Sequence, residues 1–363
     1  MTRRDQRIRD ELEESNDGQC IVPWCSGEAA ASHAIVDRQI REGGDDHPAN
    51  RVAVCDTHRR YAEQDAIPPQ AFWLWAGIDD PPLPAGLDTS DVDRRGEPFG
   101  TPRKGAERRY IKYRSTRHLL PLYREDATTA AGRTEHDDTE LGTVEPFVGR
   151  PLVVTHKMDG SNCTLVGDPQ QPVRARNGSE PIETMRPLYR PGGMYWTQTV
   201  NQKLPDRLQV FGEWLWAKHA IHYGCDCDDP CSDRGPPLTD LVDCDDERAY
   251  FQVFGVFDTE LNLWLSWPET VTVAETLGFP TVPVIDAEDD ADPATFDTPR
   301  EARRRLADYA RDVIAEGGEG IVVRPKFPYH YGQFPRRIGK YVRENHVDDE
   351  SHWRRKRRTR NRL

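Results

Sequence analysis

The sequence predicts an α+β fold built from antiparallel sheets with flanking helices, and three features support this prediction. Short apolar runs alternate with polar turns from about residue 109 onward, as expected of strands. A stretch with helical character, 299–317, precedes the last of these runs, and a small cysteine-containing unit comes before them all. This mix of strands and helices favours antiparallel pairing. The strand-like runs are 151–156, 163–167, 208–214, 250–258 and 320–325.

Length and composition set the broad class of the protein. The 363 residues are enough for two or three domains, and a hydrophobic content of 36% allows a sizeable core. No stretch approaches the roughly 18 apolar residues that cross a membrane. The first residues, "MTRRDQRIRDELEE", lack the apolar segment of a secretion signal. We therefore expect a cytoplasmic protein without a membrane partner, and a monomer.

The charge of the chain is acidic and its basic residues are mostly arginine. A net charge of -13 argues against phosphate binding over the whole surface. Only 8 of the 49 basic residues are lysine. One hypothesis is a halophilic source, where acidic, lysine-poor surfaces are favoured; the other is a genome that prefers arginine codons. In either case each remaining lysine becomes more informative.

Four metal-ligand residues fall within the first unit, residues 1–76. Cys20-x4-Cys25 and Cys55-x2-His58 form two pairs, which fits a tetrahedral zinc site with three thiolates and one imidazole. In a cytoplasmic protein such cysteines indicate a metal before a disulfide. The alternative is a coincidence of four unrelated residues.

The sequence between these two pairs contains "SHAI" and "NRVAVC". With the cysteines, it resembles a degenerate HNH nuclease fold, a ββα unit in which His33 matches the general base and Asn50 the residue that braces the strand. Ser32 stands where that family usually has a metal ligand. The resemblance implies a module that folds on Zn²⁺ and binds nucleic acid. An active nuclease is the alternative.

The rest of the chain divides by composition. Residues 77–108 are rich in Pro, Gly and charge, which predicts a flexible linker, and 109–350 form the main domain. An insert at 225–244 could bind a second zinc or hold free thiols. The last segment, 351–363, is a basic tail that would bind phosphates or remain a solvated end. The insert contains Cys225, Cys227, Cys231 and Cys244, and seven basic residues lie between Arg354 and Arg362.

The stretch "VVTHKMDGSNCTLV", residues 153–166, places Lys157, Asp159 and Gly160 at what reads as the tip of a β-hairpin. Asp-Gly is a favoured turn pair, so a plain turn is one interpretation. The other is chemical. A nucleophilic lysine must be neutral, which requires a site that lowers its pKa. The glycine would let a phosphate approach the backbone, and the aspartate would orient the amine or a metal ion.

Further motifs follow this lysine in order. "FGE" ends a strand at Glu213, the aromatic strand "FQVFGVFD" comes next, "EGGEGIVVRPK" contains Glu319, and "RRIGKYVR" contains Lys340. Several motifs in order are more specific than any one. Together with "KYRSTRHL" and "RARNGS", they resemble the covalent nucleotidyltransferase superfamily, and within it the ATP-dependent RNA ligases of bacteria and phages that seal nicked RNA. The resemblance covers about residues 110–350 and implies a nucleotidyltransferase domain of two antiparallel sheets.

The resemblance also implies roles for single residues. Lys157 would attack the α-phosphorus of ATP and form lysyl-AMP, next to Asp159 and Gly160 of the same nucleotide site. Arg176, in "RARNGS", would bind the phosphates or the RNA 5′-phosphate. Glu213 would accept hydrogen bonds from the ribose hydroxyls.

The later motifs supply the remaining roles. Phe254 would stack on adenine, with Phe251 as the near alternative. Glu319 would hold Mg²⁺ (or Mn²⁺), and Lys340 would contact the α-phosphate. The family often has a Lys-x-Lys pair here, but this chain does not. The second role is therefore missing or is taken by one of two arginines, Arg337 or Arg343.

The length beyond Lys340 favours one branch of the superfamily. Only 23 residues (363 − 340) follow, too few for the OB-fold of DNA ligases and capping enzymes. The implied function is an ATP-dependent RNA ligase that joins 5′-phosphate and 3′-OH ends through lysyl-AMP and adenylated RNA, in RNA repair. Its cofactors would be ATP, Mg²⁺ (or Mn²⁺) and Zn²⁺. The alternatives are a DNA-strand ligase of the same chemistry, or a nuclease or end-binding protein based on the zinc module.

Overall fold

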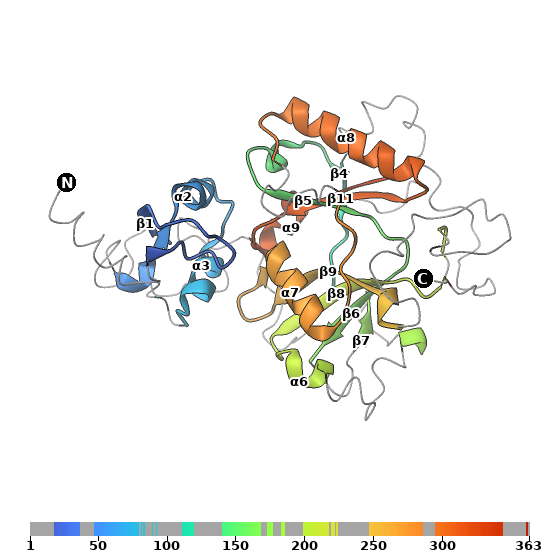
Figure 1. The fold of residues 1–363 in the computed structure, drawn as a ribbon, viewed down its shortest axis with the longest axis horizontal. Coiled ribbons are helices and arrows are strands. Elements are labelled where there is room, and N and C mark those ends of the chain that lie inside the picture. The colour runs from blue at the N-terminus through green and yellow to red at the C-terminus, as the bar shows by residue number, and fades with distance from the viewer. Residues whose placement is uncertain are drawn as a thin grey trace. The chain divides into compact units, whose positions relative to one another are not determined.

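The computed structural model of the chain divides into two compact units (Figure 1). Unit 1 joins the amino-terminal part to two short later segments, and unit 2 contains the rest. Unit 1 is Met1–Glu107, Glu260–Trp264 and Phe327–Gln333; unit 2 is Arg108–Thr259, Leu265–Lys326 and Phe334–Leu363. The structure describes residues 18–36, 47–79, 81, 83, 89, 92, 111–119, 140–167, 173–176, 183–185, 199–217, 219–221, 223, 247–285, 295–343 and 361.

A ββα arrangement forms the first part of unit 1, as predicted. Strands β1 (Ala31–Ala34) and β2 (Arg51–Val54) pair antiparallel, and helix α2 (Asp56–Glu63) follows directly. Cys55 caps α2, because its sulfur accepts a hydrogen bond from the backbone N–H of His58. Helix α3 then begins with a proline, which suits the first turn of a helix, and spans Pro69–Ala76.

The later segments of unit 1 share its core. Strand β10 (Leu263–Trp264) pairs antiparallel with β12 (Tyr329–His330). Phe327, two residues before β12, is 3% exposed and belongs to the same hydrophobic cluster as the amino-terminal strands. Its ring contacts the rings of Trp24 and Tyr61. The amino-terminal residues and the chain around 260–264 and 327–333 therefore form one core.

Part of the segment predicted as a linker also packs on this core. Leu83 and Val92 are buried in it. The side-chain amide of Gln70 donates hydrogen bonds to the backbone carbonyls of Thr89 and Val92, at 3.0 and 2.7 Å. These described positions are held by unit 1, while the domain boundaries remain a prediction.

In the first sheet of unit 2, the strands pair antiparallel with their neighbours. A bulge in strand β8 (Leu208–Trp214) lies between Phe211 and Gly212. A β-carbon at Gly212 would lie 2.5 Å from the ring of Phe251 on the next strand, so only glycine allows this approach. The strands are, in order, β9 (Phe251–Asp258), β8 (Leu208–Trp214), β6 (Ser161–Val166) and β7 (Val173–Ala175).

The second sheet of unit 2 has five strands and mixed direction. Strand β11 (Gly320–Pro325) is antiparallel to both of its neighbours. Strand β3 (Arg117–Leu119), in contrast, runs parallel to β13 (Gly339–Val342) and β4 (Glu140–Leu141). The two predicted sheets are confirmed, but the expectation of purely antiparallel pairing is not met here. The reason is topological: the chain leaves β3 and returns to β13 only after building the rest of the unit. The order is β4 (Glu140–Leu141), β3 (Arg117–Leu119), β13 (Gly339–Val342), β11 (Gly320–Pro325) and β5 (Leu152–His156).

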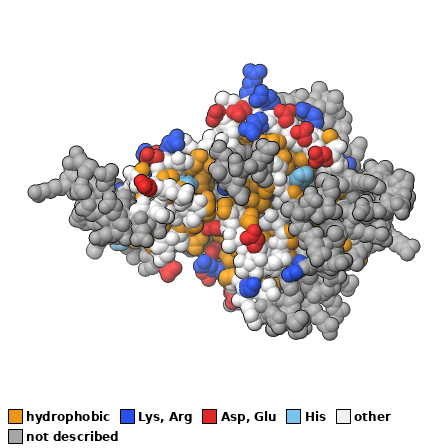
Figure 2. Space-filling view, in the orientation of Figure 1, with side chains coloured by type: hydrophobic (Ala, Val, Ile, Leu, Met, Phe, Trp, Pro, Cys, Tyr) orange, Lys and Arg blue, Asp and Glu red, His pale blue; other side chains and the backbone are white. Residues whose placement is uncertain are grey.

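Helix α8 (Pro299–Ala315) packs on this five-stranded sheet, and it confirms the predicted helix to within two residues (Figure 1). The hydroxyl of Thr298 caps it by accepting a hydrogen bond from the N–H of Glu301. Figure 2 shows basic and acidic side chains mixed over its exposed side, so this face carries no field of one sign. The buried stripe of the helix, at helical spacing, is Ala302, Leu306, Ala310 and Val313.

The remaining elements are short, apart from α7 (Trp267–Leu277), which begins with a capping box between Ser266 and Glu269. Among the described ranges, no helix has the length and apolar character needed to cross a membrane. The short elements are η3 (Pro48–Asn50), η5 (Glu145–Phe147), η6 (Glu183–Met185), α6 (Asn201–Lys203), η8 (Glu247–Tyr250), η9 (Tyr331–Gln333) and α9 (Phe334–Arg337).

Candidate functional site

Lys157 lies where the chain crosses from one sheet of unit 2 to the other. β5 ends at His156 in the five-stranded sheet, and β6 begins at Ser161 in the first sheet. The N–H of Lys157 donates a hydrogen bond to the carbonyl of Gly320 at 2.8 Å. The hairpin interpretation of this stretch is therefore wrong. The turn connects two sheets, and its lysine lines the pocket between them.

Three carboxylates surround the Lys157 amine. Its Nζ lies 2.8 Å from Oε2 of Glu319, and Glu213 and Asp159 add their charge. Burial alone would lower the pKa of Lys157, but the three charges outweigh it and raise that pKa. Burial raises the pKa of both Glu319 and Glu213, to about 8 for Glu213. Contrary to the requirement for a nucleophile, this arrangement holds the amine as an ammonium ion.

Asp159 and Gly160 fix the turn that carries the lysine. One oxygen of Asp159, Oδ2, accepts hydrogen bonds from the N–H groups of Ala220 and Ile221, at 2.7 and 2.8 Å. A β-carbon at Gly160 would lie 2.7 Å from the carbonyl oxygen of Trp214, so no larger residue fits. The carboxylate thus binds the segment after β8, and the glycine allows the turn to press against the end of that strand.

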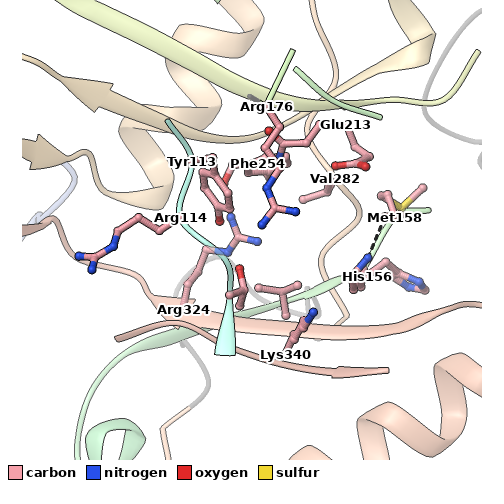
Figure 3. A pocket seen from close by; sticks show the side chains of 14 residues that line it. Tyr113, Arg114, His156, Met158, Arg176, Glu213, Phe254, Val282, Arg324 and Lys340 are labelled. Atoms are coloured by element: carbon pink, nitrogen blue, oxygen red, sulfur yellow. Dashed lines mark hydrogen bonds between the residues drawn. The ribbon is translucent and has the colours of Figure 1, made fainter. Parts of the chain in front are cut away.

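A pocket between the two sheets brings five of the predicted residues together (Figure 3). They come from the crossover after β5, the end of β7, and strands β8, β9 and β13. Figure 3 shows cationic and carboxylate groups pointing into the same space. The site therefore combines an amine, an acid and an aromatic ring with further positive charge. The five residues are Lys157, Arg176, Glu213, Phe254 and Lys340.

The structure distinguishes the two candidate aromatic residues of β9. Phe254 lines the pocket and packs edge-on against Tyr113, with 4.9 Å between ring centroids. Phe251 is fully buried and packs against Phe279 in the core of the unit. Only Phe254 can therefore present its ring to a molecule in this pocket.

The cations near the end of the domain are arranged differently from the expectation. Lys340 lines the pocket, but neither Arg337 nor Arg343 is among its lining residues. The N–H of Arg343 instead donates a hydrogen bond to the carbonyl of Glu319, at 2.9 Å. Additional positive charge in the pocket comes from Arg114 and Arg324, which both line it.

Sequence reasoning missed Tyr113 and Arg324 as pocket residues. The guanidinium of Arg324, a residue that is 6% exposed, donates hydrogen bonds to the carbonyl of Phe254 and, at 3.2 Å, to the hydroxyl of Thr155. It also lies 5.9 Å from the centroid of the Phe254 ring. Arg324 therefore braces the aromatic residue. Tyr113 lies in the motif "KYRSTRHL" and Arg324 in the motif "GIVVRP", so their place in these motifs could have identified them as site residues.

The predicted zinc ligands of unit 1 come together in space. The ligand atoms of Cys20, Cys25, Cys55 and His58 all lie within 4.8 Å of one another. The sulfurs of Cys25 and Cys55 are 3.9 Å apart, close to the roughly 3.8 Å edge of a tetrahedron with 2.3 Å Zn–S bonds. Burial lowers the pKa of His58 to about 4 and raises that of Cys20 to about 12. The imidazole is thus neutral and able to coordinate, and the thiols would lose protons on binding a metal.

The other HNH-like residues have structural positions. Asn50 is fully buried, and its side chain accepts a hydrogen bond from the N–H of Val36 and donates one to its carbonyl, at 2.9 and 3.0 Å. His33 is 6% exposed and packs against Phe72. The Ser32 hydroxyl accepts a hydrogen bond from Arg51 at 2.7 Å. Asn50 thus braces the chain as predicted, while the burial of His33 does not suit a general base that must reach a substrate.

Two predictions fall outside the described residues. The cysteine insert with Cys225, Cys227, Cys231 and Cys244 is one, and the seven basic residues of the tail from Arg354 to Arg362 are the other. Both stay predictions.

Comparisons with known proteins place the chain in a family. Solved structures similar to it include an archaeal ATP-dependent RNA ligase (16% identity, TM-score 0.36, 64% of this chain and 48% of that one covered). Others are a Naegleria gruberi RNA ligase variant with ATP and Mn (13%, 0.38, 65% and 56%) and a candidate ATP-dependent DNA ligase from Aquifex aeolicus (15%, 0.37, 64% and 50%). The chain spans about half the length of each of these structures.

The family of the chain is established by sequence similarity. None of the curated proteins compared with the chain matches it. The sequence model of the RNA ligase family, in contrast, matches residues 150–342, more than half of the chain. That range begins two residues before β5, ends with β13 and contains the lysine crossover and most of the pocket. The chain therefore belongs to the RNA ligase family.

Proposed function

We propose that this protein is an ATP-dependent RNA ligase that joins 5′-phosphate and 3′-OH ends of RNA in repair. It would do so through lysyl-AMP and adenylated-RNA intermediates. The observation that carries the proposal is the placement of Lys157. Its amine is paired with Glu319 at 2.8 Å and opens into a pocket that is also lined by the aromatic ring of Phe254 and by four further lysine and arginine side chains.

The pocket supplies the groups that nucleotidyl transfer needs. The ammonium of Lys157 passes a proton to Glu319, whose raised pKa suits it as an acceptor. The free amine then attacks the α-phosphorus of ATP, forming the N–P bond as the O–P bond to pyrophosphate breaks. Lys340 and Arg176 offset the charge that develops on the phosphate oxygens. Phe254 stacks on adenine, and Glu213 binds the ribose.

The acidic side of the pocket fits a divalent cation. Mg²⁺ and Mn²⁺ prefer oxygen ligands, and the carboxylates of Glu319 and Glu213 both lie near the lysine amine. A cation bound there would supply positive charge that favours the neutral form of Lys157. Glu319 is therefore the residue that would hold it, and Glu213 remains the residue that binds the ribose.

The test is transfer of label from α-labelled ATP to the protein. Wild type should retain the label through denaturation, and Lys157→Ala should not. Lys203→Ala is the matched control, because Lys203 is exposed and its amine donates a hydrogen bond to the carbonyl of Thr276, outside the pocket. Labelling of Lys157→Ala at the wild-type level would overturn the assignment.

The second part of the proposal is that the strand joined by the enzyme is RNA. Nicked duplexes that differ only in whether the nicked strand is RNA or DNA should be sealed preferentially when it is RNA. Preferential sealing of DNA would replace RNA ligation with the alternative of the same chemistry. Nuclease activity has less support, because His33 is buried and no described residue replaces the metal ligand expected at Ser32.

We also infer that one Zn²⁺ holds the amino-terminal unit together through Cys20, Cys25, Cys55 and His58. The support is that their four ligand atoms all lie within 4.8 Å of one another, with 3.9 Å between the sulfurs of Cys25 and Cys55. Metal analysis should find one zinc per chain fewer in Cys55→Ser than in wild type. Cys163→Ser should keep the zinc, because Cys163 is a buried cysteine of β6 outside the cluster. Equal zinc in all three proteins would contradict the inference.

A further inference from the structure

Asn361 is fully buried and hydrogen-bonded through both its backbone and its side chain. Its N–H donates to the carbonyl of Trp216 at 3.0 Å, and its carbonyl accepts from the hydroxyl of Tyr250 at 2.9 Å. Its side-chain oxygen accepts from the N–H of Tyr223 at 3.3 Å, and its side-chain nitrogen donates to the carbonyl of Leu215. Such complete pairing at a position 138 residues beyond Tyr223 indicates a defined place in the fold.

Three of the four residues bound by Asn361 lie at the two ends of one short segment. Leu215 and Trp216 directly follow the strand that carries Glu213, and Tyr223 closes the segment. A single amide suits this position because it accepts a hydrogen bond at one end and donates one at the other. Asn361 therefore closes the segment 215–223, called here the β8 loop, at its base.

The middle of the β8 loop holds the lysine motif. The N–H groups of Ala220 and Ile221 donate to one oxygen of Asp159, and the N–H of Asp159 donates to the hydroxyl of Tyr223 at 2.8 Å. Tyr223 is thus bonded to Asn361 through its backbone and to Asp159 through its side chain. Asp159 follows Lys157, the proposed nucleophile, with only Met158 between them.

We propose that Asn361 is a positioning residue of the nucleotide site. It closes the β8 loop, the loop holds Asp159, and Asp159 fixes the turn that aims the Lys157 amine. This inference rests on the proposed adenylation of Lys157 and adds to it a residue outside the range that matches the family model. Asn361 touches neither the amine nor the pocket lining, so it acts through the loop.

The test is single-turnover labelling with α-labelled ATP, with rate constant and final labelled fraction measured separately. Asn361→Ala should lower the rate constant on the order of ten- to a hundredfold, because small misplacements of a nucleophile have effects of that size. The final labelled fraction should equal that of wild type, because the folded protein still completes the reaction. Asn361→Asp, which has the same shape but cannot donate to the Leu215 carbonyl, should also be slow.

Two further variants complete the test. Arg362→Gln changes a neighbouring charge and should label at the wild-type rate. Tyr223→Phe removes the acceptor of the Asp159 N–H, and combined with Asn361→Ala it should be no slower than the slower single variant, since both act through one loop. If Asn361→Ala does not fold, Tyr223→Phe alone must show the slow rate with a full end point.

Two results would overturn the positioning role of Asn361, and a third would overturn the proposed function as well. A wild-type rate constant in Asn361→Ala overturns the inference, and so does a lower labelled fraction with an unchanged rate constant, which indicates loss of folded protein only. In either case label on wild type leaves the proposed function intact. If wild type itself takes no label, the proposed function fails and the inference fails with it.

Discussion

The Nζ of Lys157 lies 2.8 Å from Oε2 of Glu319, so the proposed nucleophile is held as the cation of a largely buried ion pair. The pair keeps the amine in place but also keeps it protonated, because neighbouring carboxylates raise its pKa. Attack on phosphorus therefore requires positive charge that competes with the ammonium for Glu319. Activation and substrate binding are coupled in such a site.

Replacing Glu319 should move the pH dependence of adenylation. In Glu319→Gln the charge that contributes most to raising the pKa of Lys157 is lost, so that pKa falls and the neutral amine forms at lower pH. The rising limb of a plot of labelling rate against pH should shift to lower pH. The maximum rate should fall by about 10²-fold or more, because the proton acceptor and metal ligand is gone.

The matched control for this prediction is Glu316→Gln. Glu316 is exposed, three residues before Glu319, and its charge acts on His156 rather than on Lys157. Its profile should coincide with that of wild type. A shift of the Glu319→Gln profile to higher pH would show that Lys157 is not governed by this pair.

Glu213 should make stability fall as pH rises. Its pKa is about 8 in the folded protein, against an ordinary value of 4.5, because burial disfavours the charged form. Between these values the native state keeps a proton that the unfolded state has lost, so the free energy of unfolding decreases with pH. Glu213→Gln removes this dependence. The difference in free energy of unfolding between wild type and Glu213→Gln should therefore change by roughly 1 to a few kcal/mol from pH 5 to pH 8.

Urea unfolding at several pH values measures this effect. Glu275→Gln is the control, because Glu275 is an exposed carboxyl on α7, and its curve should run parallel to that of wild type. A wild-type protein that gains stability relative to Glu213→Gln over the same range would show that Glu213 is ionised in the fold.

Substitutions of Phe251 and Phe254 on β9 should have different effects, one on protein stability and the other on ATP binding. Phe254→Leu keeps an apolar side chain but removes the ring from the pocket, so the ATP concentration for half-maximal labelling should rise up to about tenfold. Phe251→Leu changes a fully buried core residue, so it should lower the melting temperature and leave that concentration unchanged. The reverse pattern would assign the adenine contact to Phe251.

The parts of the site that sequence predicts are those carried by local motifs. Lys157, Glu213 and Lys340 each stand at a strand end or on a strand whose apolar pattern is readable, and all three line the pocket. Arg324 and Asn361 are different. Their partners are 70 and 146 residues away in the sequence, and only the completed sheets bring them together. No local pattern could show that one braces Phe254 and the other closes the loop behind Asp159.

The same limit explains the error about the lysine turn. Two strands separated by Asp-Gly favour a hairpin on local grounds. In the fold, β5 pairs with β11, far along the chain, and β6 pairs with the next strand, β7, and with β8. Turn chemistry predicts the bend correctly but cannot predict the sheet to which the next strand belongs.

The zinc cluster is packed against a residue from a distant part of the chain. The ring of Phe327 lies edge-on to the imidazole of His58, with 5.4 Å between centroids, and 5.3 Å from the ring of Tyr61. Nδ1 of the same imidazole faces the sulfurs of Cys20 and Cys55, at 3.4 and 3.1 Å. The orientation of the ring that would bind the metal therefore depends on Phe327.

Phe327→Ala should accordingly weaken zinc retention without touching a ligand. Loss of the ring frees His58 to turn, and changes around metal ligands typically cost 10- to 100-fold in affinity, so transfer of zinc to a coloured chelator should be at least about tenfold faster. Phe296→Ala is the control, because Phe296 is an equally buried phenylalanine in the core of unit 2. That variant should lose stability but release zinc at the wild-type rate. Equal release from Phe327→Ala and wild type would show that the four ligands hold the metal without support from residues 327–333, and the amino-terminal unit would then bind zinc independently of the rest of the chain.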